Sequence, residues 1–95
     1  VLKDYAKVLK WYRLSAEQGD ADAQHSLGFM YELGTGVLQD NVTAHMWYNI
    51  ASANGNEGTG ELRDKVEARM TNEDISKATA MARECMNSDY YNCSF

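Results

Sequence analysis

The stretch AEQGDADAQHSLGFMYELGTGV, residues 16–37, decides the fold of this 95-residue chain. Small and apolar side chains recur in it at the spacing of one helix face: Ala23, Leu27, Met30 and Tyr31. Asp20 precedes this stripe, and its carboxylate can accept hydrogen bonds from the first free amides of a helix. Gly34 follows the stripe, and glycine adopts the left-handed conformation that ends many helices at little cost. The stretch therefore predicts a helix that begins after Asp20 and ends before Gly34.

The chain also repeats itself: Trp11-Tyr12 recurs as Trp47-Tyr48, a period of 36 residues. The same shift places Gly19 on Gly55 and residues 1–4 (VLKD) on residues 37–40 (VLQD). Periods of this length are typical of stacked helical hairpins, in which each repeat buries its apolar face against its neighbours. This register places Val1 in the middle of a repeat, which predicts a parent protein that extends further at its N-terminus.

Polar caps and apolar stripes predict further helices on both sides of this one. Asp4 opens the first and Asp40 the third; Asn56 opens a fourth that runs to about Arg69, and Thr71 opens the fifth. The inward stripes are Val8, Trp11, Tyr12 and Ser15 in the first helix, and Ala44, Trp47, Tyr48 and Ala51 in the third. They are Leu62, Val66 and Met70 in the fourth, and Ile75, Ala78, Met81, Ala82 and Cys85 in the fifth. The fold class is therefore all-α, a superhelix or solenoid of antiparallel helical hairpins with five helices, the last of which caps the C-terminal end.

The opening stretch, together with Asp40, Ala44 and Trp47-Tyr48, closely resembles the Sel-1-like repeat, a relative of the tetratricopeptide repeat. The resemblance covers the chain as a single domain fragment: a half repeat at 1–19, a full repeat at 20–55 and a diverged C-terminal capping repeat at 56–95. In the last repeat Arg63-Asp64 replaces the Leu-Gly pair of the motif. Such a divergence is expected where a terminal repeat meets water.

The resemblance also implies a partner-binding groove, because the first helix of each tetratricopeptide-like pair lines the concave side of the stack. In this sequence the groove positions are Asp22, His25, Phe29, Glu32 and Leu33 of the full repeat, and Glu61, Lys65 and Arg69 of the last one. Phe29 is the expected anchor, because it is a large aromatic residue on the face opposite Leu27 and Met30. The alternative is that a preceding repeat covers Phe29 as part of the core.

The function implied by this resemblance is that of a protein–protein interaction scaffold or adaptor, with a protein or peptide partner and no cofactor. The alternative is an enzyme, because a secreted, cysteine-rich branch of the same family is linked to penicillin binding and β-lactamase activity. That branch carries a cysteine pair in each repeat, whereas Ser15 and Ala23, and Ala51 and Thr59, occupy such positions here. The expectation is therefore a domain that is not an enzyme.

Composition and spacing argue against other classes of function. A formal charge of −5 disfavours nucleic acid as a partner, and no stretch approaches the ~20 apolar residues of a membrane helix. His25 and His45 lack a cysteine or carboxylate at ligand spacing, so no metal site is expected. The Trp-Tyr pairs could form a ligand platform, but their helical spacing and repeat register favour the core. No nucleophile–base pair or phosphate-binding loop is recognisable.

The first predicted helix is expected to expose part of its apolar surface. The repeat register implies a preceding helix against which residues around Leu9 and Trp11 would pack. Without that helix the patch predicts self-association, or a contact in which another chain covers this N-terminal face.

Cys85 and Cys93 lie near the C-terminus with seven residues between them. The turn-like Asn87-Ser88 is expected to end the last helix, and a tail that reverses there can bring Cys93 within bonding distance of Cys85. Sel-1-like proteins of bacterial envelopes often end in a similar cysteine-containing tail, which implies a disulfide and a periplasmic or secreted location. The alternatives are two reduced thiols, one of them buried, and a cytoplasmic location.

Overall fold

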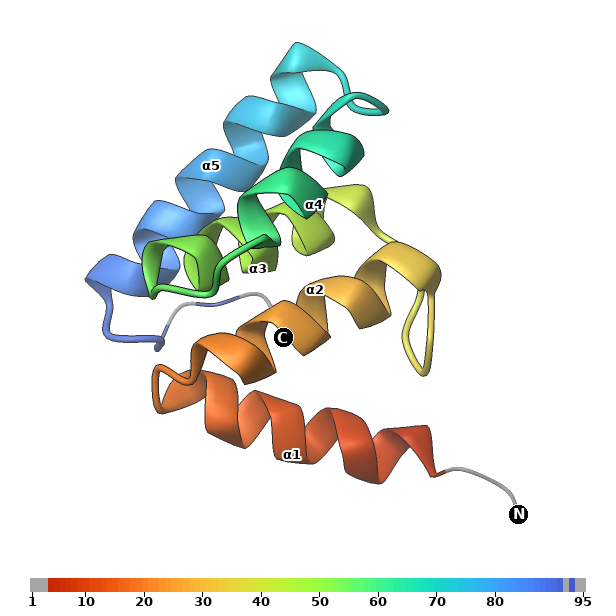
Figure 1. Ribbon diagram of the computed structural model, residues 1–95, viewed down its shortest axis with the longest axis vertical. Coiled ribbons are helices and arrows are strands. Elements are labelled where there is room, and N and C mark those ends of the chain that lie inside the picture. The colour runs from red at the N-terminus through yellow and green to blue at the C-terminus, as the bar shows by residue number, and fades with distance from the viewer. Residues whose placement is uncertain (1–3, 92, 94–95) are drawn as a thin grey trace.

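The computed structural model describes residues 4–91 and Cys93, and it consists of helices joined by short turns (Figure 1). This part of the chain contains no strand and five helices: α1 (Tyr5–Glu17), α2 (Ala21–Leu33), α3 (Asn41–Ala53), α4 (Thr59–Glu67) and α5 (Asn72–Asn87). The predicted all-α fold is therefore confirmed. None of these helices combines the length and the apolar character that crossing a membrane requires.

α3 is the central helix of the stack. It packs against α2 on one side and against α4 and α5 on the other, while α1 packs against α2 (Figure 1). Consecutive helices from α1 to α4 pack together and run antiparallel, as the solenoid prediction requires, while α5 packs against α3. The stack is elongated, with extents of 40 × 27 × 23 Å along its principal axes.

Local capping signals set most of the helix boundaries. The Asp20 side chain accepts hydrogen bonds from two backbone amides at the start of α2, at 2.9 and 3.3 Å. The predicted caps of α1, α3 and α5 bond in the same way: Asp4, Asp40 and Thr71. Gly34 ends α2 in the left-handed conformation, with a φ of 72°. The sequence therefore predicts these boundaries correctly, because each depends on a few neighbouring residues.

The start of α4 differs from the prediction. Asn56 does not cap this helix, which begins after Gly58, a residue in the left-handed region with a φ of 86°. The Asn56 side chain is used elsewhere: it donates to Asp22 at 2.8 Å and accepts from the Thr59 hydroxyl at 2.5 Å. α4 also ends two residues earlier than predicted. A contact between repeats has therefore replaced the local cap.

The core lies around α3, whose aromatic pair is completely buried. Trp47 and Tyr48 are both 0% exposed, which confirms that this pair belongs to the core and not to a ligand platform. Gly28 of α2 allows Tyr48 to approach closely, because a Cβ at this position would lie 2.5 Å from the tyrosine ring. Small residues are buried at other helix contacts as well: Ala16, Ala23, Ala44, Ala51, Ala78 and Ala82.

The predicted inward face of α1 is wrong in part. Leu9 and Ala16 are the buried residues, whereas Trp11 is 69% and Val8 38% exposed. Leu9 is thus covered, contrary to the prediction, while Tyr12 packs partly buried against the core, as predicted. α1 packs against α2 along the face that carries Leu9, so the side that carries Trp11 is turned towards solvent.

Candidate functional site

The predicted groove lies where α2 meets the α4 segment, and polar side chains join the two there. Two contacts lie near the start of these segments and one near their ends: His25 Nδ1 to Thr59 Oγ1 at 3.0 Å, Asn56 Nδ2 to Asp22 Oδ1 at 2.8 Å, and Arg69 Nη2 to Glu32 Oε2 at 3.0 Å. The structure therefore brings four predicted groove residues together, but it engages them in contacts between repeats: Asp22, His25, Glu32 and Arg69.

Phe29 and Leu33 form the apolar part of the predicted groove. They are 48% and 59% exposed, and a spacing of four residues places them on the same face of α2. Glu61 and Lys65 of α4 are also exposed. Phe29 is therefore not a core residue in this structure. We call Phe29, Leu33, Lys65 and the exposed Arg69 the α2–α4 surface. Glu61 lies apart from it, in a hollow between the end of α3 and the start of α4.

Glu32 is held at the edge of this surface by two donors. The Tyr48 hydroxyl donates to Glu32 Oε1 at 2.6 Å, and Arg69 bonds the other carboxylate oxygen at 3.0 Å. Burial, followed by the bond to Glu32 and its negative charge, raises the pKa of Tyr48 far above its ordinary value. The hydroxyl therefore keeps its proton and remains a donor. The helix stripe predicted that Tyr48 is buried, but it carried no signal for the group that its hydroxyl meets.

The two histidines have separate partners. His45 is 1% exposed, and its Nε2 lies 2.8 Å from Glu67 Oε1. His25 is bonded to the Thr59 hydroxyl instead. Within residues 4–91 and Cys93, no three His, Cys, Asp or Glu side chains gather into a potential metal site. Both histidines are engaged in contacts between helices.

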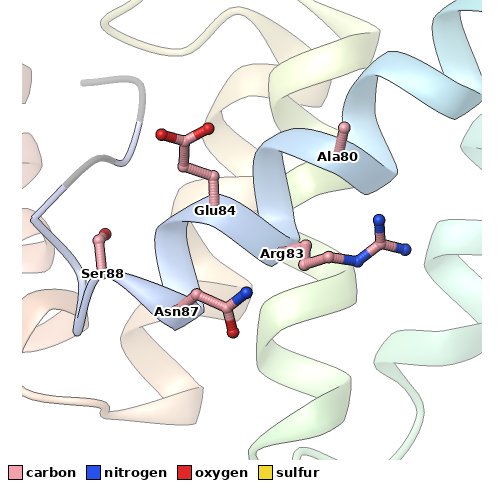
Figure 2. A pocket seen from close by; sticks show the side chains of 5 residues that line it. All are labelled: Ala80, Arg83, Glu84, Asn87 and Ser88. Carbon is pink, nitrogen blue, oxygen red and sulfur yellow. The ribbon is translucent and has the colours of Figure 1, made fainter.

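Two hollows on the described part of the surface lie away from the apolar pair on α2. One of about 400 Å³ lies on α5, where Arg83 and Glu84 are among the lining residues (Figure 2). Ser88, also in its lining, donates its hydroxyl to the Cys85 carbonyl at 3.0 Å. Another hollow, of about 590 Å³, lies between the end of α3 and the start of α4 and includes Glu61.

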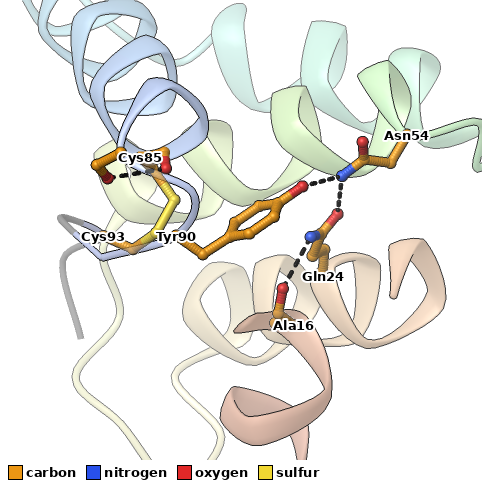
Figure 3. Close-up of a disulfide and its surroundings, with 7 residues drawn as sticks. Ala16, Gln24, Asn54, Cys85, Tyr90 and Cys93 are labelled. Carbon is orange, nitrogen blue, oxygen red and sulfur yellow. Dashed lines mark hydrogen bonds between the residues drawn. A yellow bond between two sulfur atoms is a disulfide. The ribbon is translucent and has the colours of Figure 1, made fainter. Parts of the chain in front are cut away.

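The C-terminal tail folds back after α5. The structure joins Cys85 and Cys93 in a disulfide, with 4.5 Å between their Cα atoms (Figure 3). The helix ends at Asn87, as predicted. The chain then reverses at Asp89 and Tyr90, whose φ angles of 57° and 68° lie in a region that residues other than glycine rarely adopt.

Tyr90 completes a chain of hydrogen bonds that crosses the stack (Figure 3). Asn54 Nδ2 donates to the Tyr90 hydroxyl at 2.8 Å and to Gln24 Oε1 at 2.9 Å. Gln24 Nε2 donates in turn to the Ala16 carbonyl at 3.0 Å. The chain links the tail to α3, α2 and the end of α1. Its one signal in the sequence is Gln24, a polar residue beside the inward Ala23.

Antiparallel helical hairpins that stack in register and close around small residues define a helical-repeat protein. The family model of the Sel1 repeat matches residues 1–20 and 21–56, which together make up more than half of the chain. The chain therefore belongs to the Sel1 repeat family, whose repeats generally serve protein–protein interaction. The resemblance inferred from the sequence is confirmed.

One relative is chitin synthase regulatory factor 3 of Schizosaccharomyces pombe, which is 42% identical to this chain over 53 residues. The match covers 56% of this chain and 6% of that protein. The chain thus spans a small part of the relative's length, and the similarity is one of a repeat region.

Proposed function

We propose that this domain is a non-enzymatic adaptor that holds a protein or peptide partner on the α2–α4 surface. The observation that carries the proposal is the exposure of Phe29 and Leu33, 48% and 59%, on one face of α2. Large apolar side chains in such positions lose water on binding and commonly anchor a partner. Membership of the Sel1 repeat family supports the proposal, because these repeats generally serve protein–protein interaction.

The structure beneath this surface suits a binding site. Arg69 and Glu32 are paired across two repeats, and Tyr48 holds Glu32 from α3. Because these contacts exist before a partner arrives, less conformational entropy is lost on binding. Exposed Lys65 adds a further positive charge, and Glu32 supplies a negative one. We expect a partner segment with one or two large apolar side chains and with charges of both signs.

Three observations favour the role of an adaptor over that of a penicillin-binding or β-lactamase-like enzyme. Ser88, the serine in the α5 hollow, donates to a backbone carbonyl. The disulfide closes the tail, whereas the enzyme-linked branch of the family pairs cysteines within each repeat. The name of the fission yeast relative describes a regulatory factor, which fits a domain that acts by holding another protein.

The Cys85–Cys93 disulfide supports an oxidising location for this domain, either periplasmic or secreted. Alkylation of the protein as purified from its native compartment tests this location, because only free thiols are modified. Intact-mass analysis should show no alkylated cysteine. Two alkylated thiols would argue against both the bridge and the compartment.

The adaptor role is tested by capture with the full-length parent protein, followed by mass spectrometry and affinity measurement on the partner found. Phe29→Ala should weaken binding by more than about 1 kcal/mol, roughly fivefold in Kd, while the free energy of unfolding changes little. The matched control is Met86→Ala, because Met86 is an apolar residue on α5 that is 36% exposed. Equal loss of binding in both variants, or a large loss of stability in Phe29→Ala, would contradict the proposal.

A further inference from the structure

An asparagine–glycine pair, Asn54-Gly55, directly follows α3. Asparagine is a chemically labile residue, above all before glycine, because the backbone nitrogen of the next residue attacks its side chain and glycine hinders that approach least. Asn54 is exposed, and in the described part of the structure no atom lies within 4 Å of a Cβ added at Gly55. Water, the other reactant, therefore reaches this turn.

The reaction, deamidation, replaces the side-chain amide by an acid in two steps. In the first, the Gly55 nitrogen gives its proton to a base in solvent and bonds to Asn54 Cγ. The bond from Cγ to Nδ2 breaks, and ammonia leaves with a proton taken from solvent. In the second, water adds to one carbonyl carbon of the cyclic imide and opens the ring. Cleavage of the new bond to Cγ gives aspartate, whereas cleavage of the original peptide bond gives isoaspartate.

The folded turn holds this pair in an unreactive conformation. The ψ angle of Asn54 is 13°, which places the Gly55 nitrogen on the side of the Cα–C bond that points away from Cβ. The Gly55 N–H also donates to the Ser52 carbonyl at 3.1 Å. Ring closure requires rotation about the Cα–C bond and the loss of this hydrogen bond. The reaction therefore requires a local opening at the end of α3.

Two further hydrogen bonds hold the Asn54 side chain (Figure 3). Its Nδ2 donates to Gln24 Oε1 at 2.9 Å and to the Tyr90 hydroxyl at 2.8 Å. Both bonds must break before Cγ can turn towards the attacking nitrogen. Tyr90 belongs to the tail that the disulfide ties to α5. The bridged tail therefore adds to the free energy of the opening that the reaction requires.

The preceding repeat has the same turn without the labile residue. The 36-residue shift maps Asn54-Gly55 onto Gln18-Gly19. The two glycines have φ angles of 94° and 87°, and Gln18 has a ψ angle of 0°, close to that of Asn54. Glutamine carries one more methylene, so the attack would have to close a larger ring, which is much slower. The chain therefore contains its own unreactive counterpart of the site.

Deamidation would break the link between the tail and the first hairpin. An acid at position 54 has no N–H to donate. Gln24 is 0% exposed, so its Oε1 would lose a partner in a buried place and would face a carboxylate. Isoaspartate would also insert one side-chain carbon into the backbone at the end of α3. Both products disrupt the hydrogen-bond chain at its centre.

We propose that Asn54-Gly55 is a site of spontaneous deamidation that the bridged tail protects. While the disulfide is intact, Tyr90 keeps the Asn54 amide in place and the reaction is slow. When a dithiol reductant exchanges with the bridge, the reductant becomes a disulfide and the two cysteines become thiols. The end of α3 then opens more often, and Asn54 is converted. Reoxidation does not restore the amide, and the site does not depend on the adaptor role of the α2–α4 surface.

The rate of deamidation is measured by incubating the protein in mildly alkaline buffer, followed by proteolysis in acid and mass spectrometry. Fragment spectra locate the change at Asn54 and separate aspartate from isoaspartate. A synthetic peptide with the sequence of residues 50–58, IASANGNEG, gives the rate without the fold. The bridged protein should react at least about tenfold more slowly than this peptide, because the turn must open first. The fragment that contains Gln18 is the internal control and should stay unchanged.

Variants separate protection by the tail from protection by the fold in general. Tyr90→Phe removes only the hydroxyl that holds Asn54 and should speed the reaction at least about threefold, the effect of one hydrogen bond. A reductant should speed the reaction at least as much in the wild-type protein and leave Cys93→Ser, which is already fast, unchanged. The matched control is Tyr91→Phe, because the neighbouring Tyr91 is 91% exposed and its variant should react like the wild-type protein. Circular dichroism checks that each variant is folded.

Three results would overturn the proposal. The first is deamidation of the bridged protein at the rate of the peptide, because the fold would then give no protection. The second is an equal rate in the wild-type protein and in Tyr90→Phe, or an equal increase in Tyr90→Phe and Tyr91→Phe. The third is the absence of deamidation at Asn54 in the reduced protein over a time in which the peptide is fully converted.

Discussion

Ala44 and Val8 occupy equivalent positions in α3 and α1, yet Ala44 is 0% and Val8 38% exposed. Ala44→Leu is expected to lower the free energy of unfolding by about 1–3 kcal/mol, because the added carbons must fit between packed helices. Val8→Leu adds one carbon at the exposed counterpart and should change stability by less than about 0.5 kcal/mol. Urea denaturation measures both. A neutral Ala44→Leu would show that this face of α3 is not packed as described.

Two glycines inside helices make a second matched pair. A Cβ at Gly28 would lie 2.5 Å from the Tyr48 ring, whereas the nearest atom to a Cβ at Gly60 would be Ser52 Oγ at 3.7 Å. Gly28→Ala should destabilise the fold by about 1–3 kcal/mol through overpacking, although alanine favours a helix by about 1 kcal/mol over glycine. Gly60→Ala should be neutral or stabilising. Stabilisation by both changes in thermal melts would contradict this account of Gly28.

Tyr48 also makes stability depend on pH in the alkaline range. Burial and the bond to Glu32 raise the pKa of Tyr48 well above its ordinary value of 10.0, so the folded protein keeps a proton that the unfolded chain releases. The stabilising contribution is therefore complete below pH 10.0 and is lost as the pH rises beyond it. Urea melts between about pH 8 and about pH 11 should show a steeper decline in the wild-type protein than in Tyr48→Phe. Equal slopes would contradict this assignment.

At the scale of helices, the sequence predicts best what depends on near neighbours. The extents of α2 and α3 follow from Asp20, Gly34 and Asp40, because a cap needs only the next few residues. The start of α4 could not be found in this way, since Asn56 is engaged by a residue of the preceding repeat. The sequence also could not show which face of α1 is buried. The Trp11-Tyr12 pattern matches that of α3, and the two helices differ only in the helices that surround them.

The candidate surface shows the same difference between local features, which the sequence predicts, and contacts between repeats, which it does not. The helical period places Phe29 and Leu33 outside the core, and both are exposed as that period predicts. Repeat spacing does not reveal that Glu32 meets Arg69, a residue 37 positions away. That pair forms only when two repeats stack, so its members were predicted as free groove residues.

The C-terminal loop can be tested as a separate element. The disulfide spans a sequence separation of 8 residues, and its removal by Cys93→Ser should lower the free energy of unfolding by about 2–3 kcal/mol. A reductant should destabilise the wild-type protein by a similar amount and leave Cys93→Ser unaffected, as measured by urea denaturation. An equal effect of the reductant on both proteins would show that the bridge is not its target.

Over the whole molecule, the tail adds contacts that a simple stack lacks. In a solenoid each repeat contacts only its neighbours. Here the Tyr90 hydroxyl is linked through Asn54 and Gln24 to the Ala16 carbonyl at the end of α1. The Tyr90 ring also lies near Gly19, in the turn between α1 and α2, where an added Cβ would come within 3.8 Å of it. The last element of the chain therefore meets the first hairpin, and no pattern within one repeat could have predicted this contact.

This contact between distant elements changes how the domain is expected to come apart. A linear array frays from its ends, so a terminal helix opens without disturbing the rest. Opening of α1 breaks the bond from Gln24 to the Ala16 carbonyl, which is the first link of the hydrogen-bond chain that ends on Tyr90. The bridge from Cys85 to Cys93 holds Tyr90 in place at the other end of this chain. The bonded protein should therefore unfold as one cooperative unit, while the reduced protein should lose protection of its α1 amides against hydrogen exchange first.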